Sequence, residues 1–183
     1  HPEEVAFADT IEEDLGRRDF TVNALALDMG AKQQIIDPFG GQKDLKDGVI
    51  RAVGNPADRF NEDALRLMRA VRFAVQLGFE IEEKTGEAIR AHAALLEYIA
   101  MERVRDELTR IIMSPQASRG IQLLEDYDLL RFIMPELREG IDVGQNKHHI
   151  YTVWEHNLRA LQYTAEKKYS LVVRIASLLH DVG

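Results

Sequence analysis

Hydrophobic and polar residues alternate with two different spacings along this chain, and the change falls near residue 56. Before it, short runs of β-branched, aromatic and apolar residues predict short strands. A turn at Met29-Gly30 predicts that the last two of these runs form a hairpin. The Asp37-Pro38-Phe39-Gly40-Gly41 sequence that follows predicts a hinge-like turn without regular structure. The predicted strands lie at 5–8, 20–22, 23–28 and 34–37.

After Gly54-Asn55-Pro56, apolar residues recur at the spacing of amphipathic helices. Gly78 is a candidate glycine just beyond a helix end, and Ser114-Pro115 is a candidate helix start. The segment 135–147 contains glycines and predicts a loop. The helices predicted by this spacing are 58–78, 84–95, 100–113, 115–126, 152–167 and 170–180.

These patterns together predict an α+β fold that is predominantly helical, with its short strands confined to the first part of the chain. We expect three parts, with boundaries near residues 56 and 135. The first, 1–56, carries the strands. The second, 57–135, and the third, 136–183, are helical.

Composition narrows the class of protein. With 183 residues, 45% of them hydrophobic, the chain is long enough to bury a core, and a net charge of −8 argues against a protein that coats nucleic acid with its whole surface. The absence of cysteine suits a cytoplasmic protein, and no apolar run reaches the length of a membrane span. Because the chain begins with His1 and ends just after an apolar run, we expect it to be a piece of a longer protein.

One predicted helix carries a row of cations. Arg66, Arg69 and Arg72 recur every third residue after Asp63, and no other charged residue lies between Ala64 and Phe79. Only Asp63 is available to neutralise the row locally, through a pair with Arg66. A guanidinium matches phosphate oxygens and base edges, so an uncompensated row predicts a polyanionic ligand such as a nucleotide, whereas an ordinary charge run is a solvated helix face.

Three segments, taken in order, resemble a known series of motifs. They are Arg17-Arg18-Asp19-Phe20-Thr21-Val22-Asn23-Ala24-Leu25-Ala26, Asp37-Pro38-Phe39-Gly40-Gly41-Gln42-Lys43-Asp44-Leu45 and Glu62-Asp63-Ala64-Leu65-Arg66-Leu67-Met68-Arg69-Ala70-Val71-Arg72-Phe73. In order and spacing this series is similar to the bacterial class II tRNA nucleotidyltransferases, the CCA-adding enzymes, and to the related poly(A) polymerases. The resemblance implies the rear part of a nucleotidyltransferase head in 1–56, a helical neck in 57–135 and the start of an HD-like body in 136–183.

The resemblance also implies a binding role for several residues. Asp63 and Arg66 match the family residues that read the base of the incoming nucleotide, and Arg18 matches a nucleotide-contacting arginine. Arg69 and Arg72 match residues lining the nucleotide site, where they would contact phosphates or brace the base readers, and Asp19 would contact the ribose. The alternative for Arg18 and its neighbour Arg17 is an ordinary pair of surface arginines near the start of a strand.

Chemistry supports an Asp-Arg pair as the reader. Cytosine and adenine present an exocyclic amine beside an unprotonated ring nitrogen, so a carboxylate accepts from the amine while a guanidinium donates to the ring. Uracil and guanine present a carbonyl beside a ring N–H, so the positions of donor and acceptor are exchanged. Such a pair selects C and A without a nucleic-acid template.

The resemblance further implies that the catalytic centre, an aspartate pair that holds Mg²⁺, lies upstream of Arg18, and it is not in this sequence. Asp126-Tyr127-Asp128 has two aspartates with the right separation, but it falls at a predicted helix end, where Asp is ordinary cap chemistry. Phosphoryl transfer needs carboxylates that clamp the metal ions. We therefore expect the chain alone to bind nucleotide weakly and to catalyse nothing.

A second candidate site lies near the C-terminus. His156 and the His180-Asp181 pair resemble the opening of an HD domain, whose histidines and aspartates hold a divalent metal for phosphohydrolysis. Imidazole and carboxylate groups are competent ligands for a transition metal. The alternative is that these residues brace helices.

The sequence thus predicts part of an enzyme that adds CMP and AMP to tRNA 3′ ends from CTP and ATP. Within the same class, an A-adding enzyme, a CC-adding enzyme and a poly(A) polymerase share the same Asp-Arg reader. From other classes, a non-catalytic nucleotide- or RNA-binding helical module and an HD phosphohydrolase stay open.

Overall fold

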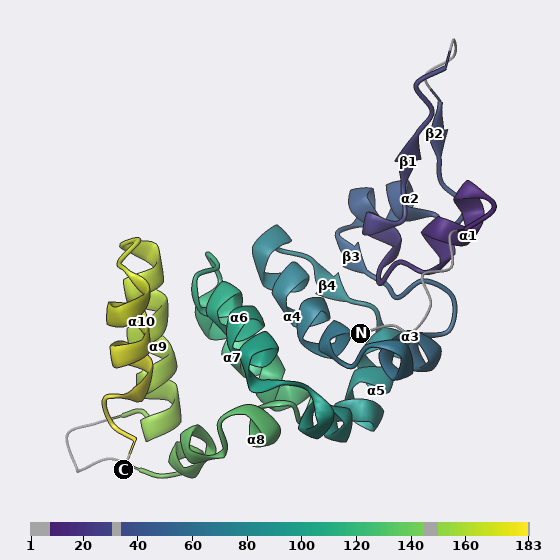
Figure 1. Cartoon of the computed structure of the whole chain (residues 1–183). Coiled ribbons are helices and arrows are strands. Elements are labelled where there is room, and N and C mark those ends of the chain that lie inside the picture. The colour runs from purple at the N-terminus through teal and green to yellow at the C-terminus, as the bar shows by residue number, and fades with distance from the viewer. Residues whose placement is uncertain (1–7, 31–33, 145–149, 183) are drawn as a thin grey trace.

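The computed structural model describes residues 8–30, 34–144 and 150–182. In the described residues, helices dominate and the strands are two residues long. The elements form a curved array that runs from the β1–β2 hairpin, through α4 and the α6–α7 pair, to α9 and α10 (Figure 1). No described helix is long and apolar enough to cross a membrane.

The first part holds short elements. The helices are α1 (Ile11–Gly16), η1 (Thr21–Asn23) and α2 (Gly41–Asp47), and the strands are β1 (Ala26–Leu27), β2 (Ile35–Ile36) and β3 (Val49–Ile50). β1 and β2 pair antiparallel, which confirms the predicted hairpin. The strand predicted at 20–22 is wrong: Phe20 makes only an isolated bridge with Ala52, and a 3-10 turn follows. Most of the strand predicted at 5–8 lies outside the described residues.

The Asp37–Gly41 sequence starts a helix rather than forming a hinge. Asp37 accepts hydrogen bonds from the backbone N–H groups of Gly41 at 2.7 Å and Gln42 at 3.0 Å, and so caps α2. Burial pushes the pKa of Asp37 upward, but these bonds outweigh it and lower the pKa below its usual value. Gly40 has φ of 75°, and a Cβ on Gly41 would lie 2.2 Å from the Thr21 carbonyl oxygen. Both positions therefore require glycine.

The rest of the chain is helical, as predicted. Its helices are α3 (Pro56–Glu62), α4 (Leu65–Leu77), α5 (Glu83–His92), η2 (Ala93–Tyr98), α6 (Met101–Ile112), α7 (Ala117–Asp126), α8 (Leu130–Ile133), η3 (Pro135–Gly140), α9 (Val153–Glu166) and α10 (Leu171–Leu179), with one strand, β4 (Glu80–Ile81). Gly78 ends α4 with φ of 72°, as expected. The single helix predicted over 58–78 is wrong, because the chain breaks at Asp63 and Ala64 between α3 and α4.

Several smaller predictions have clear outcomes. Ser114 does not cap α7, which begins at Ala117 after Gln116. α7 ends at Asp126, as predicted, and Asp128 adopts φ of 62°, so Asp126-Tyr127-Asp128 is a helix end. The segment 135–147 includes the η3 turn before its last residues leave the described part of the chain.

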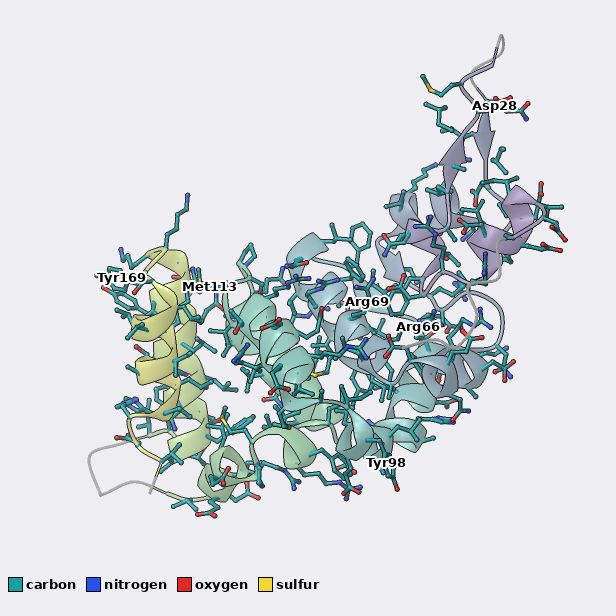
Figure 2. All side chains as sticks on the ribbon, in the orientation of Figure 1. Asp28, Arg66, Arg69, Tyr98, Met113 and Tyr169 are labelled. Atoms are coloured by element: carbon teal, nitrogen blue, oxygen red, sulfur yellow. The ribbon has the colours of Figure 1, made fainter. Side chains whose placement is uncertain are left out.

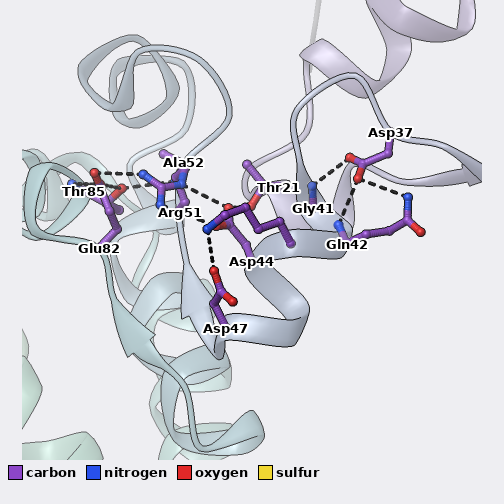
Figure 3. A network of polar contacts seen from close by, with 11 residues as sticks. Thr21, Asp37, Gly41, Gln42, Asp44, Asp47, Arg51, Ala52, Glu82 and Thr85 are labelled. Carbon is purple, nitrogen blue, oxygen red and sulfur yellow. Dashed lines mark hydrogen bonds and ion pairs between the residues drawn. The ribbon is translucent and has the colours of Figure 1, made fainter.

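A polar network joins the first part of the chain to the helical part (Figure 3). The buried Asp44 accepts from Thr21 at 2.7 Å and from Arg51 at 3.0 Å, and the bond from Arg51 to Asp44 raises the pKa of Arg51. Arg51 also pairs with Glu82 at 3.0 Å, just beyond β4. β3 and β4 pair parallel, with Val49 opposite Glu80 and Ile50 opposite Ile81. The two parts are therefore held together by backbone and side-chain bonds.

The described residues form two hydrophobic clusters, a small one around Leu15, Ala24 and Val53 and a large one that reaches the last helices. The large cluster contains Phe20 and Ile50 from the first part, the inner face of α4, and Trp154, Leu161 and Leu178 from the last helices. Trp154 is buried and donates from Nε1 to Gln122, so it belongs to the core rather than to a base-stacking surface. Side chains from both sides of residue 56 therefore share the large cluster.

Candidate nucleotide-binding site

A cleft of about 440 Å³ opens where the turn after α1 meets the start of α4 and the start of α6. It contains five arginines and only two aspartates, in a chain whose net charge is −8. Such a local excess of positive charge attracts anionic ligands. Figure 2 shows Arg66 and Arg69 on α4, on the side of that helix nearer the first part of the chain. The lining residues are Arg17, Arg18, Asp19, Asn23, Asp63, Leu65, Arg66, Arg69 and Arg103.

Asp63 lies at the break between α3 and α4, in extended backbone with φ of −152°. Its Oδ1 accepts from the backbone N–H of Leu65 at 3.1 Å, and its Oδ2 accepts from Arg103 at 2.8 Å. The side chain is one-third exposed. The break thus turns a carboxylate toward the cleft and anchors it at the start of α4.

Arg66 is bonded to two other segments, α3 and the turn after α1, through three hydrogen bonds. Its Nη1 donates to Glu62 at 2.7 Å and to the Arg59 carbonyl at 3.1 Å, and its Nη2 donates to the Arg17 carbonyl at 2.9 Å. The expected Asp63–Arg66 pair is therefore wrong: Glu62, one turn before Arg66, takes that place. These bonds occupy three of the five guanidinium donors, which leaves Nε and one Nη2 hydrogen for a ligand.

Arg69 bridges the helix to the first part of the chain. Its Nε donates to Oδ2 of Asp19 at 2.7 Å, across 50 residues of sequence. Oδ1 of the buried Asp19 accepts from the Phe20 backbone at 2.9 Å and from Asn23 at 3.3 Å. Asp19 therefore lines the cleft as an anchor for Arg69, with both of its oxygens engaged.

Arg72 does not line the cleft. It is buried against α6, where its Nε lies 3.2 Å from Glu107, and its guanidinium stands over the Phe73 ring at 4.4 Å. Burial lowers the pKa of Arg72, while the charge of Glu107 opposes that shift. The uncompensated cationic row predicted from the sequence is wrong, because each of its three arginines has a carboxylate partner.

Arg18 and Arg17 lie at the cleft edge with half-exposed side chains. Arg18 pairs with Asp14 at 3.2 Å, one turn earlier, and Arg17 approaches the same carboxylate at 3.7 Å. Exposed pairs of this kind contribute little to stability and are easily exchanged for another anion. The pair that Arg18 forms with Asp14 is therefore one that an anion in the cleft could replace.

Two lining residues, Asn23 and Arg103, carry no role in the sequence-based predictions. Asn23 belongs to the first motif, and it donates to Asp19. Arg103 belongs to a separate helix, α6, and lies 40 residues from its partner Asp63. The polar face of an amphipathic helix gives no local signal for such a contact. Only the packing of α6 against α4 reveals it.

The C-terminal histidine cluster does come together. Nε2 of His156 on α9 lies 3.0 Å from Nε2 of His180, which follows α10, and both lie 3.7 Å from Oδ2 of Asp181. Ligand atoms of the three residues all lie within 4.8 Å of one another, the only such group among the described residues. His180 Nδ1 is bonded to the Ser177 carbonyl at 2.9 Å, which leaves its Nε2 directed to the cluster. The donor set fits a transition metal.

Two family models match the sequence, in separate segments. The family described as "Poly A polymerase head domain" matches residues 1–51, and that described as "Probable RNA and SrmB- binding site of polymerase A" matches residues 78–141. The cationic helix α4 lies between the two matched segments.

Similar curated proteins carry related names. The A-adding tRNA nucleotidyltransferase of Deinococcus radiodurans is 46% identical over 180 residues, which cover 94% of this chain and 41% of that protein. The CCA-adding enzyme of Streptococcus mutans is 52% identical over 132 residues, covering 70% of this chain and 32% of that protein. The chain thus spans less than half the length of these relatives.

Solved structures agree in fold. The Bacillus stearothermophilus CCA-adding enzyme in complex with CTP is 38% identical, with a TM-score of 0.68 over 87% of this chain and 35% of that one. A tRNA nucleotidyltransferase complexed with a primer tRNA and an incoming ATP analog is 27% identical, with a TM-score of 0.73 over the whole of this chain and 53% of that one. The motif series, the fold and these matches agree, and the chain belongs to the class II tRNA nucleotidyltransferase and poly(A) polymerase family.

Proposed function

We propose that this chain supplies the base-reading cleft of an enzyme that adds CMP and AMP to tRNA 3′ ends from CTP and ATP. The observation that carries the proposal is the cleft itself, in which Asp63 and Arg66 are fixed by several bonds at the edge of a cationic surface. Neighbours of known structure bind CTP, an ATP analog and a primer tRNA. We place the enzyme in the cytoplasm.

Asp63 and Arg66 retain the hydrogen-bonding capacity that base reading needs. A carboxylate has about four acceptor sites, and the described contacts of Asp63 use one on each oxygen. Arg66 keeps Nε–H and one Nη2–H. A base whose amine meets Asp63 and whose bare ring nitrogen meets Arg66 satisfies both, as cytosine and adenine do. With uracil or guanine, the base carbonyl would face the Asp63 carboxylate and the ring N–H would face Arg66, so that acceptor meets acceptor and donor meets donor.

The other arginines would receive the triphosphate and hold the readers in place. Arg18 is half-exposed at the cleft edge, where an anion can displace Asp14. Arg69 is held by Asp19, so we assign it to bracing, together with Arg72 behind it on the same helix. Asp19 has both oxygens engaged, but it lines the cleft and a ribose hydroxyl can still bond to it.

The reaction would join the tRNA 3′-oxygen to the α-phosphorus of the nucleotide, with pyrophosphate leaving. Both carboxylates that line the cleft, Asp19 and Asp63, are paired with arginines, so these residues do not fit a divalent cation. We therefore expect Mg²⁺ to be held mainly by carboxylates outside this chain. This chain's part in the reaction is to bind and orient the nucleotide.

Relatives similar to this chain carry different names, A-adding and CCA-adding, so similarity over this region is compatible with more than one product. A CC-adding enzyme and a poly(A) polymerase are alternatives of the same class. A non-catalytic nucleotide- or RNA-binding module is the alternative of another class. It is distinguished by an absence of incorporation in the full-length protein.

The full-length protein, given Mg²⁺, CTP, ATP and a tRNA lacking its 3′-terminal CCA, is expected to lengthen the tRNA, whereas this chain alone is expected to add nothing. The reason is that the metal-binding carboxylate pair is expected outside it. Radiolabelled nucleotide resolved on a sequencing gel measures both the extent and the order of addition. Incorporation by this chain alone would contradict the assignment of the catalytic carboxylates, and none by the full-length protein would contradict the proposed function.

A second candidate function rests on the His156, His180 and Asp181 cluster, whose ligand atoms lie close enough to share one ion. These three residues would hold a transition metal, and the bound ion would supply a Lewis acid for phosphohydrolysis, as in HD domains. The bond between Nδ1 of His180 and the Ser177 carbonyl fixes the orientation of the ring, which would present Nε2 to the ion.

Three ligands leave coordination positions open, so this chain is expected to bind Mn²⁺ or Zn²⁺ weakly and a longer segment of the protein more tightly. His180→Ala is expected to abolish binding in both, with nucleotide addition by the full-length protein largely intact. Isothermal titration with each metal measures this. His92→Ala is the control, because His92 is a histidine outside the cluster, where it bonds to the Ala88 carbonyl of its own helix and contacts the Phe60 ring. Equal metal binding by His180→Ala and the unchanged protein would leave these residues structural.

A further inference from the structure

We propose that Arg103 is a positioning residue for base selection: it fixes the carboxylate of Asp63 so that the acceptor meets the base amine. The inference rests on the proposed function, since it assigns a role within the same cleft. Arg103 comes from α6, a helix outside the motif that carries Asp63 and Arg66, and its Nη2 lies 2.8 Å from Oδ2 of Asp63.

The Asp63 carboxylate is held from two directions. Oδ1 accepts from the backbone of Leu65 at the start of α4, and Oδ2 accepts from Arg103 on α6. One bond alone would leave the carboxylate free to turn about its terminal torsion, which has broad minima. Two donors on two different helices fix its plane. Selection between an amine and a carbonyl depends on that plane, because a base edge offers its groups in a fixed direction.

The helix that carries Arg103 is itself pinned to α4. Arg103, Glu107 and Ile111 follow one another at intervals of four residues along α6, and so lie on one face. Ile111 is fully buried in the core, and Glu107 forms the buried pair with Arg72 of α4. α4 and α6 make one of the most extensive helix contacts of the described chain. Arg103 therefore lies at the exposed end of this face of α6. The buried contacts of Glu107 and Ile111 fix the position of the helix that carries it.

Stability gives little reason for the Asp63–Arg103 pair. The side chain of Arg103 is 50% exposed and that of Asp63 is 33% exposed, and exposed ion pairs contribute little to folding. Both residues line the cleft, together with Arg66. A pair that stabilises the fold only slightly, yet orients the proposed base acceptor, is expected to act on selectivity rather than on folding.

The test compares Arg103→Ala, Arg103→Lys and Arg105→Ala in the full-length protein. Arg105 is the matched control, since it lies on the same helix, is exposed and pairs only with its neighbour Asp106. Values of kcat/KM for CTP, ATP, UTP and GTP are measured with a tRNA acceptor. Arg103→Ala is expected to lower the preference for CTP over UTP about three- to tenfold. Arg103→Lys is expected to restore part of it, and Arg105→Ala to change nothing.

Two results would overturn the inference. An equal fall of kcat/KM for all four nucleotides would make Arg103 a phosphate or RNA contact, and an unchanged preference would leave it without a role in selection. The single and double replacements of Asp63 and Arg103 by alanine separate this inference from the proposed function. If Asp63→Ala loses preference and Arg103→Ala does not, only the role of Arg103 fails. If Asp63→Ala keeps preference, the base-reader assignment fails and the Arg103 inference with it.

When both roles hold, the double variant is expected to be no less selective than Asp63→Ala alone, because Arg103 acts through Asp63. A double variant whose preference falls by the product of the two single effects would show that Arg103 acts independently of Asp63, and would also overturn the inference. Urea unfolding of each variant accompanies the kinetics, and a preference ratio does not depend on the fraction of active enzyme.

Discussion

Asp63→Ala and Arg66→Ala in the full-length protein are each expected to reduce the preference for CTP and ATP over UTP and GTP, and to affect tRNA binding less. Each change removes one charge-assisted hydrogen bond to the base, which is worth about 1.5 to 3 kcal/mol, or roughly ten- to a hundredfold in selectivity. Asp63 offers the acceptor and Arg66 the donor, so the two changes relax discrimination at different edges of the base.

The measurement is the ratio of kcat/KM values for the four nucleotides, with the affinity for tRNA determined separately. Arg66 also bonds to Glu62 and to the Arg59 and Arg17 carbonyls, so Arg66→Lys is included as a milder change. Asp106→Ala and Arg105→Ala are matched controls, since both residues are exposed on α6. Wild-type preference in both the Asp63 and the Arg66 variants would refute the base-reader assignment.

Glu107→Ala is expected to destabilise the chain by about 3 to 5 kcal/mol, because it leaves the guanidinium of Arg72 buried without its partner. Arg72 and Glu107 are 7% and 5% exposed, and burial already lowers the pKa of Arg72. The guanidinium would keep its proton at neutral pH, so its charge would stand uncompensated between α4 and α6. Urea unfolding followed by circular dichroism measures the free energy of unfolding.

Removing both charges provides the control for this prediction. The double variant Arg72→Met/Glu107→Leu replaces the pair with apolar side chains, and buried pairs replaced in this way often cost little stability. We expect it to recover most of the loss seen in Glu107→Ala. A loss below about 1 kcal/mol in Glu107→Ala, the range of exposed pairs, would show that solvent reaches the pair.

The helices could be predicted from the sequence because their signals are local. α6, α9 and α10 begin and end close to the predicted residues, and Gly78 ends α4 as expected. The break at Asp63 and Ala64 could not be predicted, because apolar spacing continues across it. The start of α2 could not be predicted, because glycines there indicate a turn. Gly41 is instead required by its close packing against the Thr21 backbone. β3 and β4 are two residues long and pair across 30 residues, below what local periodicity reveals.

The cleft could be predicted in part. The sequence singles out Asp63, Arg66 and Arg69, and the structure places all three in one cleft with Arg18 and Asp19. The distant partners could not be predicted from local sequence. Arg69 pairs with Asp19, Arg72 with Glu107 and Asp63 with Arg103, and each pair is far apart in the chain. The partner of Arg66 is Glu62, which lies just before the stretch 64–79 whose charges predict an uncompensated row.

The pairing of β3 with β4 restricts how relatives with different products can be recombined. A chimera joined at residue 56 would unite β3 and Arg51 of one parent with β4, Glu82 and Thr85 of the other. The Ala52 backbone donates to Thr85 at 3.1 Å, so the two partners of this buried bond would also come from different parents. We therefore expect a chimera to keep these contacts only when the residues before 56 and those up to Thr85 are taken from the same parent.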